Sequence, residues 1–195
     1  MDIDYSQMNP IKFVYMFMRL SPFILVSFFL ISSILNQDLK GIIYLVGVFI
    51  ACFITFMVGN MMNMPINIKK PEMCHIITIG YKELSKLPMG QTIFGFTYSY
   101  LLYVIFKFNL LYTNMPMFIF FTTLIICDLY WNVMNSCFTI FHLSISLFIG
   151  VFIGIIWAIF VDSMKSKKLQ YYVGVNKNIC NKPVGQQFKC KNKTL

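Results

Sequence analysis

His142 is the residue best suited to chemistry in this chain, because it lies in a long stretch, Cys137 to Val161, that contains no Lys, Arg, Asp or Glu. Ser146, Gly150 and Gly154 follow it at four-residue steps, which places all four residues on one face of a helix. Ionisable side chains at membrane depth are costly and usually face a protein interior or a wet cavity. This helix is therefore the first place to look for chemistry, and the rest of the chain decides whether chemistry survives there.

The composition is typical of an integral membrane protein. Only 12% of the 195 residues are charged, compared with about 25% in an ordinary soluble domain. Roughly 20 apolar residues of helix cross a hydrocarbon core. Five charge-free stretches predict an all-α bundle of five transmembrane helices: Leu20 to Gln37, Gly41 to Met62, Leu87 to Phe106, Phe108 to Cys127, and Cys137 to Val161. We expect the bundle to occupy residues 20–161, between an N-terminal segment at 1–19 and a basic tail at 162–195.

The basic residues predict an orientation. With five spans, the N-terminal segment and the loop 63–86 share one face, and Lys40, Lys107 and the tail share the other. Beyond Asp162 the tail contains many lysines and no acidic residue. Because cytoplasmic segments carry an excess of Lys and Arg, we predict a cytoplasmic C-terminus and an N-terminus that is outside or lumenal.

The net charge of +9 lies beside a membrane span, and few aromatic residues accompany it. We therefore expect the bilayer and its anionic headgroups as partners of the tail, and we expect no nucleic acid. Two pairs of cysteines lie outside the spans: Cys74 with Cys137 on the loop face, and Cys180 with Cys190 in the tail. The sequence leaves open whether either pair is bonded, but a bonded pair would mark the oxidising face. We expect no metal or other cofactor, because the cysteine spacing does not fit a metal site and the chain has only two histidines.

Three short clusters fall on the loop face once the spans are threaded. They are Asn63, six residues, Lys70-Pro71; then Pro88-Met89-Gly90-Gln91; then Asn135-Ser136, five residues, His142, three residues, Ser146. Their order and spacing over about residues 40 to 161 resemble the type 2 phosphatidic acid phosphatase superfamily. Its signatures are Lys, six residues, Arg-Pro; Pro-Ser-Gly-His; and Ser-Arg, five residues, His, three residues, Asp.

The resemblance implies a phosphoryl-transfer site. In that superfamily the Lys and two Arg hold phosphate, the third-signature His attacks phosphorus, the Asp orients it, and the second-signature His protonates the leaving group. Such roles depend on positioning and charge stabilisation. Only His142 keeps its family identity among these positions. Asn63 stands for the Lys, Lys70 and Ser136 for the two Arg, Gln91 for the acid-base His and Ser146 for the Asp, while Pro71, Pro88, Gly90 and Gly150 persist.

These replacements favour a degenerate scaffold without catalysis. Gln91 cannot exchange a proton near neutral pH, and Ser146 cannot stabilise an imidazolium as a carboxylate would. Lys70 retains one cation but lacks the planar fork of Arg. Chance similarity is a further interpretation of the three clusters. The enzyme alternative is a membrane lipid phosphatase with His142 as nucleophile and Lys70 holding phosphate.

Each candidate also has a structural interpretation. Asp128 could supply the missing carboxylate to His142, but we favour a boundary residue whose carboxyl meets the membrane interface beside Tyr130. For His142 we favour a buried histidine that is hydrogen-bonded to a neighbouring helix. Gly150 and Gly154 form a small-residue face that can pack spans within one chain or join two copies, and we favour packing within the chain.

The chain is also similar to small multi-pass membrane proteins of large nucleocytoplasmic DNA viruses. The residues concerned are Leu87 to Thr92, Asp128 to Asn132, Gly154 to Trp157, and the tail from Leu169 to Cys190. This similarity implies a viral or host-derived membrane, where the basic tail could meet capsid or core proteins. We therefore expect a structural or adaptor component. A channel or transporter is a third class, but the spans offer few polar residues to line a wet pathway.

Overall fold

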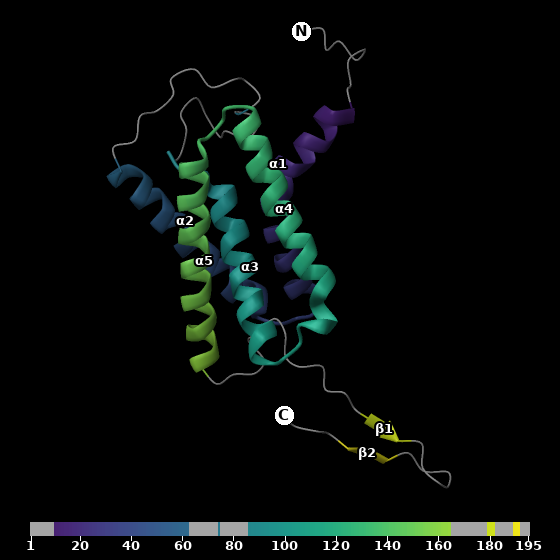
Figure 1. Ribbon diagram of the computed structural model, residues 1–195. Helices are drawn as coiled ribbons and strands as arrows, with labels where there is room; N and C mark the ends of the chain where they lie inside the picture. Colours follow the sequence, from purple (N-terminus) through teal and green to yellow (C-terminus); the bar gives the residue numbers. More distant parts are fainter. Residues whose placement is uncertain (1–9, 63–73, 75–85, 165–178, 182–188, 192–195) are drawn as a thin grey trace.

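The fold is a helical bundle followed by a small hairpin. The computed structural model describes residues 10–62, 74, 86–164, 179–181 and 189–191. These residues form five α-helices, one 3-10 turn and two strands (Figure 1): α1 Pro10–Leu35, α2 Lys40–Met61, α3 Met89–Lys107, η3 Tyr112–Asn114, α4 Met115–Met134, α5 Ile140–Ser163, β1 Ile179–Asn181 and β2 Lys189–Lys191. The all-α bundle is thus confirmed as a set of helices, whereas the antiparallel strands of the tail were not predicted.

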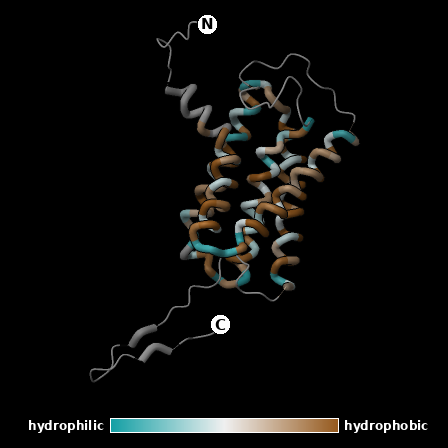
Figure 2. The backbone as a smooth tube through the Cα atoms, turned by 180° about the vertical axis from the view of Figure 1, so that it is seen from behind, coloured by the Kyte–Doolittle hydropathy of each residue, from teal (hydrophilic) through white to brown (hydrophobic). Residues whose placement is uncertain are grey.

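The outer surface of the bundle is apolar. Phe49 on α2 and Phe148 on α5 expose 66% and 72% of their surface, and many other large hydrophobic side chains on α1, α2, α4 and α5 are also exposed. Figure 2 shows apolar residues along these helices and hydrophilic residues mainly toward their ends. Among the described residues, α2, α4 and α5 are long and apolar enough to cross a membrane, and α1 contains a shorter apolar stretch, Leu20–Leu35. Part of the five-span prediction is therefore confirmed.

The third predicted span differs from the others because α3 is enclosed. Its buried face includes the polar residues Gln91, Thr92, Thr97 and Ser99. Polar side chains are tolerated inside a membrane bundle when they bond to neighbouring helices. The hydroxyls of Thr97 and Tyr44 on α2 lie 2.6 Å apart in such a bond. The polarity of α3 accompanies its central position, and α3 is not among the described helices that are apolar enough to cross a membrane.

Helix α5 packs closely along α3 because both helices carry glycines at the contact. A Cβ atom at Gly150 would lie 2.3 Å from the carbonyl oxygen of Thr92, and one at Gly154 would lie 2.6 Å from that of Phe96. On the facing helix, a Cβ at Gly95 would lie 2.6 Å from the carbonyl oxygen of Leu147. The small-residue face of α5 therefore serves packing within the chain.

The fourth predicted span, Phe108 to Cys127, is displaced from the helix that forms, Met115–Met134. Asn109 adopts the left-handed conformation (φ 53°) and closes α3, with the N–H of Leu110 donating to the carbonyl of Ile105. Pro116 then favours a helix start, because its fixed φ suits the first turn. At the other end, α4 continues past Asp128. Because the span was defined as a stretch without charged residues, its predicted first and last residues both come too early in the sequence.

The turn between α1 and α2 contains a compact polar cluster. The Ser33 hydroxyl donates to Oδ1 of Asp38 over 3.0 Å, and Nζ of Lys40 lies 3.0 Å from Oδ2 of Asp38. Partial burial raises the pKa of Asp38, but the hydrogen bonds from Lys40 and Ser33 and the charge of Lys40 outweigh this effect and lower it from the ordinary value. Nearby, Lys107 at the end of α3 pairs with Asp162 of α5.

Candidate functional site

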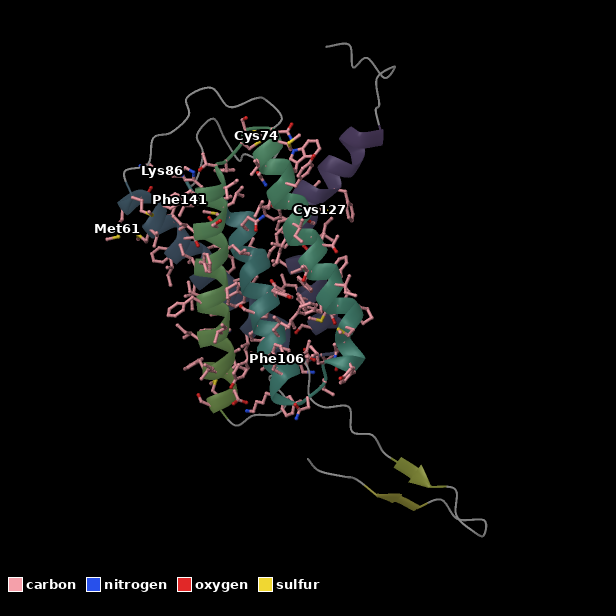
Figure 3. The ribbon with its side chains drawn as sticks, in the orientation of Figure 1. Met61, Cys74, Lys86, Phe106, Cys127 and Phe141 are labelled. Carbon is pink, nitrogen blue, oxygen red and sulfur yellow. A yellow bond between two sulfur atoms is a disulfide. The ribbon has the colours of Figure 1, made fainter. Side chains whose placement is uncertain are left out.

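The candidate site lies at the end of the bundle where α3 and α5 begin. Figure 3 shows Cys74, Lys86 and Phe141 at this end, whereas Phe106 lies at the other. Gln91 is in the first turn of α3, and His142 is in the first turn of α5. The second and third sequence clusters therefore lie at the same end of the bundle. The first cluster, Asn63, Lys70 and Pro71, lies outside the described residues.

Gln91 and Asp128 form the polar centre of the site. The Nε2 atom of Gln91 donates to Oδ2 of Asp128 over 2.7 Å. Gln91 is fully buried, and only 7% of Asp128 is exposed. The preferred interpretation of Asp128 as a boundary residue at the membrane interface is therefore wrong, because its side chain faces α3 inside the bundle. Among the described residues, Oε1 of Gln91 has no hydrogen-bond partner.

Asn132 extends this centre by one helical turn, and sequence reasoning missed it. Its Nδ2 donates to the backbone carbonyl of Asp128 over 2.7 Å, and its side chain is 1% exposed. A signal was present in the sequence, because polar residues four apart share one face of a helix. The pairing of Asp128 with Asn132 would have predicted that this face of α4 is buried.

His142 is the third residue of α5 and is partly exposed. Its Nδ1 shares a hydrogen bond with the hydroxyl of Thr139, which lies just before the helix. The favoured interpretation was a buried histidine that is hydrogen-bonded to a neighbouring helix. Its burial needs correction, because His142 is only partly buried near the start of α5. A position at the start of a span explains how one ionisable ring is accommodated without full desolvation.

Ser146 does not present its hydroxyl as an orienting group. Its Oγ donates to the backbone carbonyl of His142 over 3.0 Å, within the same helix. Its own carbonyl accepts a hydrogen bond from the Thr92 hydroxyl over 3.2 Å. Ser146 is fully buried. Its carbonyl serves the contact between α3 and α5, whereas its hydroxyl bonds within α5.

Ser136 has a backbone role in the turn after α4. It adopts φ 53°, the left-handed conformation that ends many helices. Its N–H donates to Val133, and the N–H of Cys137 donates to the carbonyl of Asn132, each over 3.0 Å. This pair of bonds closes α4 in a Schellman motif. In the sequence resemblance, Ser136 stands at the position of a phosphate-binding Arg. In this fold it shapes the turn after α4.

Pro88 and Gly90, the backbone residues of the second cluster, lie at the start of α3. Pro88 is the N-cap residue and is buried. A Cβ atom at Gly90 would lie 3.3 Å from Cγ of Pro22, which is inside α1. These residues therefore set the packing of the helix start against α1.

A disulfide joins the loop to the turn beside the site. Cys74 and Cys137 are bonded, with their Cα atoms 5.5 Å apart, and both are buried. One of the two pairings that the sequence left open is therefore formed. The bond therefore tethers residue 74, between α2 and α3, to the turn that joins α4 to α5. Within the described part of the chain, Cys52 and Cys127 are free thiols.

The assembled groups favour hydrogen bonding over group transfer. In the part of the chain that the structure describes, no group of three or more His, Cys, Asp or Glu residues could hold a metal ion. The amide of Gln91 does not exchange protons near neutral pH, and it occupies one oxygen of the Asp128 carboxyl. Comparison of the chain with known protein families, with curated proteins and with solved structures finds no significant match.

Proposed function

We propose that this chain is a multi-pass membrane protein of five spanning helices with a structural or adaptor role and no catalytic activity. The observation that carries the proposal is the hydrogen bond from Gln91 to Asp128. The two groups come from different helices, both are buried, and together they connect α3 to α4. A catalytic pair would need a group that gives or takes a proton at the position of Gln91, and an amide does neither near neutral pH.

The other polar groups of the site support the same role. The hydroxyl of Ser146 bonds to the backbone of its own helix, and the amide of Asn132 bonds to the backbone of α4. Ser136 closes a turn. Side chains that bond to backbone in these ways contribute to packing and leave little to stabilise a developing charge on a substrate.

Five spans are supported by the way the helices share their surfaces. Helices α1, α2, α4 and α5 expose apolar side chains that suit lipid, whereas α3 keeps its polar residues inside. A helix so enclosed can cross the bilayer with little contact with lipid, because its neighbours satisfy its hydroxyls. For this reason the mean hydropathy of α3, taken alone, is too low to identify α3 as a helix that crosses the membrane.

The proposed orientation combines two observations. The lysine-rich tail favours a cytoplasmic C-terminus, and the Cys74–Cys137 disulfide favours an oxidising compartment at the opposite end. In this orientation the basic tail meets anionic headgroups, or capsid or core proteins, on the cytoplasmic side. A viral or host-derived membrane as the setting rests on the sequence resemblance.

A phosphatase assay tests the non-catalytic role. The full chain, reconstituted in phosphatidate-containing vesicles, should release no inorganic phosphate above protein-free vesicles, while an active lipid phosphatase in the same vesicles does. His142→Ala should give the same result as wild type and as Phe141→Ala, a matched change of the exposed neighbouring residue. Release by wild type and by Phe141→Ala that His142→Ala abolishes would overturn the proposal and establish the lipid phosphatase.

A further inference from the structure

The tail hairpin brings two cysteines to directly opposite positions. Strands β1 and β2 pair antiparallel, with Cys180 opposite Cys190 and flanking pairs of Ile179 with Lys191 and Asn181 with Lys189. Directly opposed residues in an antiparallel pair have Cα atoms about 4.5 or 5.5 Å apart, depending on the hydrogen-bonding pattern. Both separations fall within the range of about 4.4–6.8 Å that a disulfide spans.

We propose that Cys180 and Cys190 are a second intramolecular disulfide pair, which closes the tail hairpin. Each strand has three residues, and an isolated two-stranded hairpin is marginally stable in water. A covalent link at the central pair would remove open conformations of the chain between the two cysteines. The remaining cysteines do not compete for this pairing, because Cys74 is bonded to Cys137 and the other two lie within α2 and α4.

Bond formation is a two-electron oxidation. The thiolate of one cysteine attacks a sulfur of an oxidised disulfide, such as glutathione disulfide, and forms a mixed disulfide as one glutathione leaves as thiolate. The second tail thiolate then attacks the protein sulfur of the mixed disulfide and releases the second glutathione. The protein loses two electrons and two protons, and one glutathione disulfide becomes two glutathione thiols.

The tail pair, Cys180 and Cys190, and the bundle pair, Cys74 and Cys137, would lie in different redox environments. Cys137 lies before α5, and the tail follows the opposite end of that helix. If α5 crosses the membrane, the two pairs lie on opposite sides of it, and only one side is ordinarily oxidising. The tail pair would then be a dithiol in a reducing cytoplasm and would close when an oxidant reaches that side. The pairing itself depends only on strand register, so it stands or falls separately from the non-catalytic role.

Redox titration tests the pairing. The full chain in detergent micelles is equilibrated in glutathione buffers of graded ratio, free thiols are trapped with a maleimide, and the tail peptide is identified by mass spectrometry. The matched control combines Cys190→Ser with Lys191→Cys, which keeps nearly the same loop length but moves the second thiol out of register and onto the other strand face.

The wild-type tail bond should resist reduction at least about tenfold better than the control bond, which corresponds to a difference of about 30 mV in reduction potential. Cys180→Ser should eliminate the bonded tail peptide without changing the Cys74–Cys137 peptide. Equal titration of wild type and control, or a wild-type tail that stays reduced in the most oxidising buffer, would overturn the pairing.

Discussion

The side-chain amide of Gln91 lies 2.7 Å from the carboxyl of Asp128, and this bond connects the first turn of α3 to the buried face of α4. Sequence position assigned the two residues to different roles, an inactive acid-base position and an interface residue. In the bundle they form one interhelical contact. The contact explains how a carboxyl is accommodated within α4, because a buried polar group is tolerated when it is hydrogen-bonded.

The contact predicts energetic coupling between the two residues. Gln91→Leu and Asp128→Val should each destabilise the bundle by about 1–3 kcal/mol, because each leaves the other polar group buried without this partner. The double variant should cost less than the sum, with a coupling energy of about 1 kcal/mol, measured by unfolding in detergent micelles. Additive losses of stability would show that the bond contributes no net energy.

The close crossing of α3 and α5 predicts strong sensitivity at Gly150. The Cβ atom of Gly150→Ala would overlap the carbonyl oxygen of Thr92, so the helices must separate, at a cost of about 1–3 kcal/mol. Gly59→Ala is the matched control, because its Cβ would meet the Leu87 side chain at an ordinary 3.4 Å. Thermal unfolding of both variants measures the difference. Equal melting temperatures would contradict the observed helix spacing.

The left-handed conformation of Ser136 predicts a stabilising substitution. Ser136→Gly should raise the free energy of unfolding by about 1 kcal/mol, because glycine adopts positive φ without the steric cost that a Cβ imposes. Asn135→Gly, at φ −92°, should lower stability or leave it unchanged. Ser136→Arg, which introduces the Arg of the resembling signature, should bring no phosphatase activity. A destabilised Ser136→Gly variant would argue against the turn conformation.

The Cys74–Cys137 bond predicts a large contribution to stability. Reduction, or Cys74→Ser, should lower the free energy of unfolding by about 2–4 kcal/mol, since the bond closes a loop with a sequence separation of 63. The variant carrying both Cys74→Ser and Cys137→Ser should resemble each single variant, and added reductant should not change its melting temperature. Cys127→Ser serves as control, because its thiol is free. Reductant sensitivity that persists in the double variant would place the stabilising bond elsewhere.

The polar turn between α1 and α2 predicts a contribution that is lost in acid. The pKa of Asp38 in the folded chain lies below its ordinary value of 3.8, so the ionised carboxyl stabilises the fold above that value. This stabilisation disappears as the pH falls through the lowered pKa. Asp38→Asn should therefore reduce the melting temperature at neutral pH, and the difference from wild type should vanish once the pH is below the lowered pKa of Asp38. A difference that persists in stronger acid would assign the effect to packing.

The sequence could predict most helices because lipid solvation imposes a simple compositional rule. The stretches Gly41 to Met62 and Cys137 to Val161 match α2 and α5 within a few residues, since long apolar runs must be helical in a bilayer. The same rule failed for α4. It ended the span at a carboxyl, and only the contact with Gln91 shows why Asp128 can lie inside a helix of the bundle.

The sequence by itself determined the apolar helical character of the chain, the basic tail and the three polar clusters, because composition and spacing are local properties. Only the tertiary structure decided that Gln91 meets Asp128, that Cys74 is bonded to Cys137, and that Gly150 lies against the backbone of α3. These relations join residues that are far apart in the chain. They depend on how neighbouring helices are packed, and helix packing is fixed by side-chain complementarity between elements, which hydropathy does not encode.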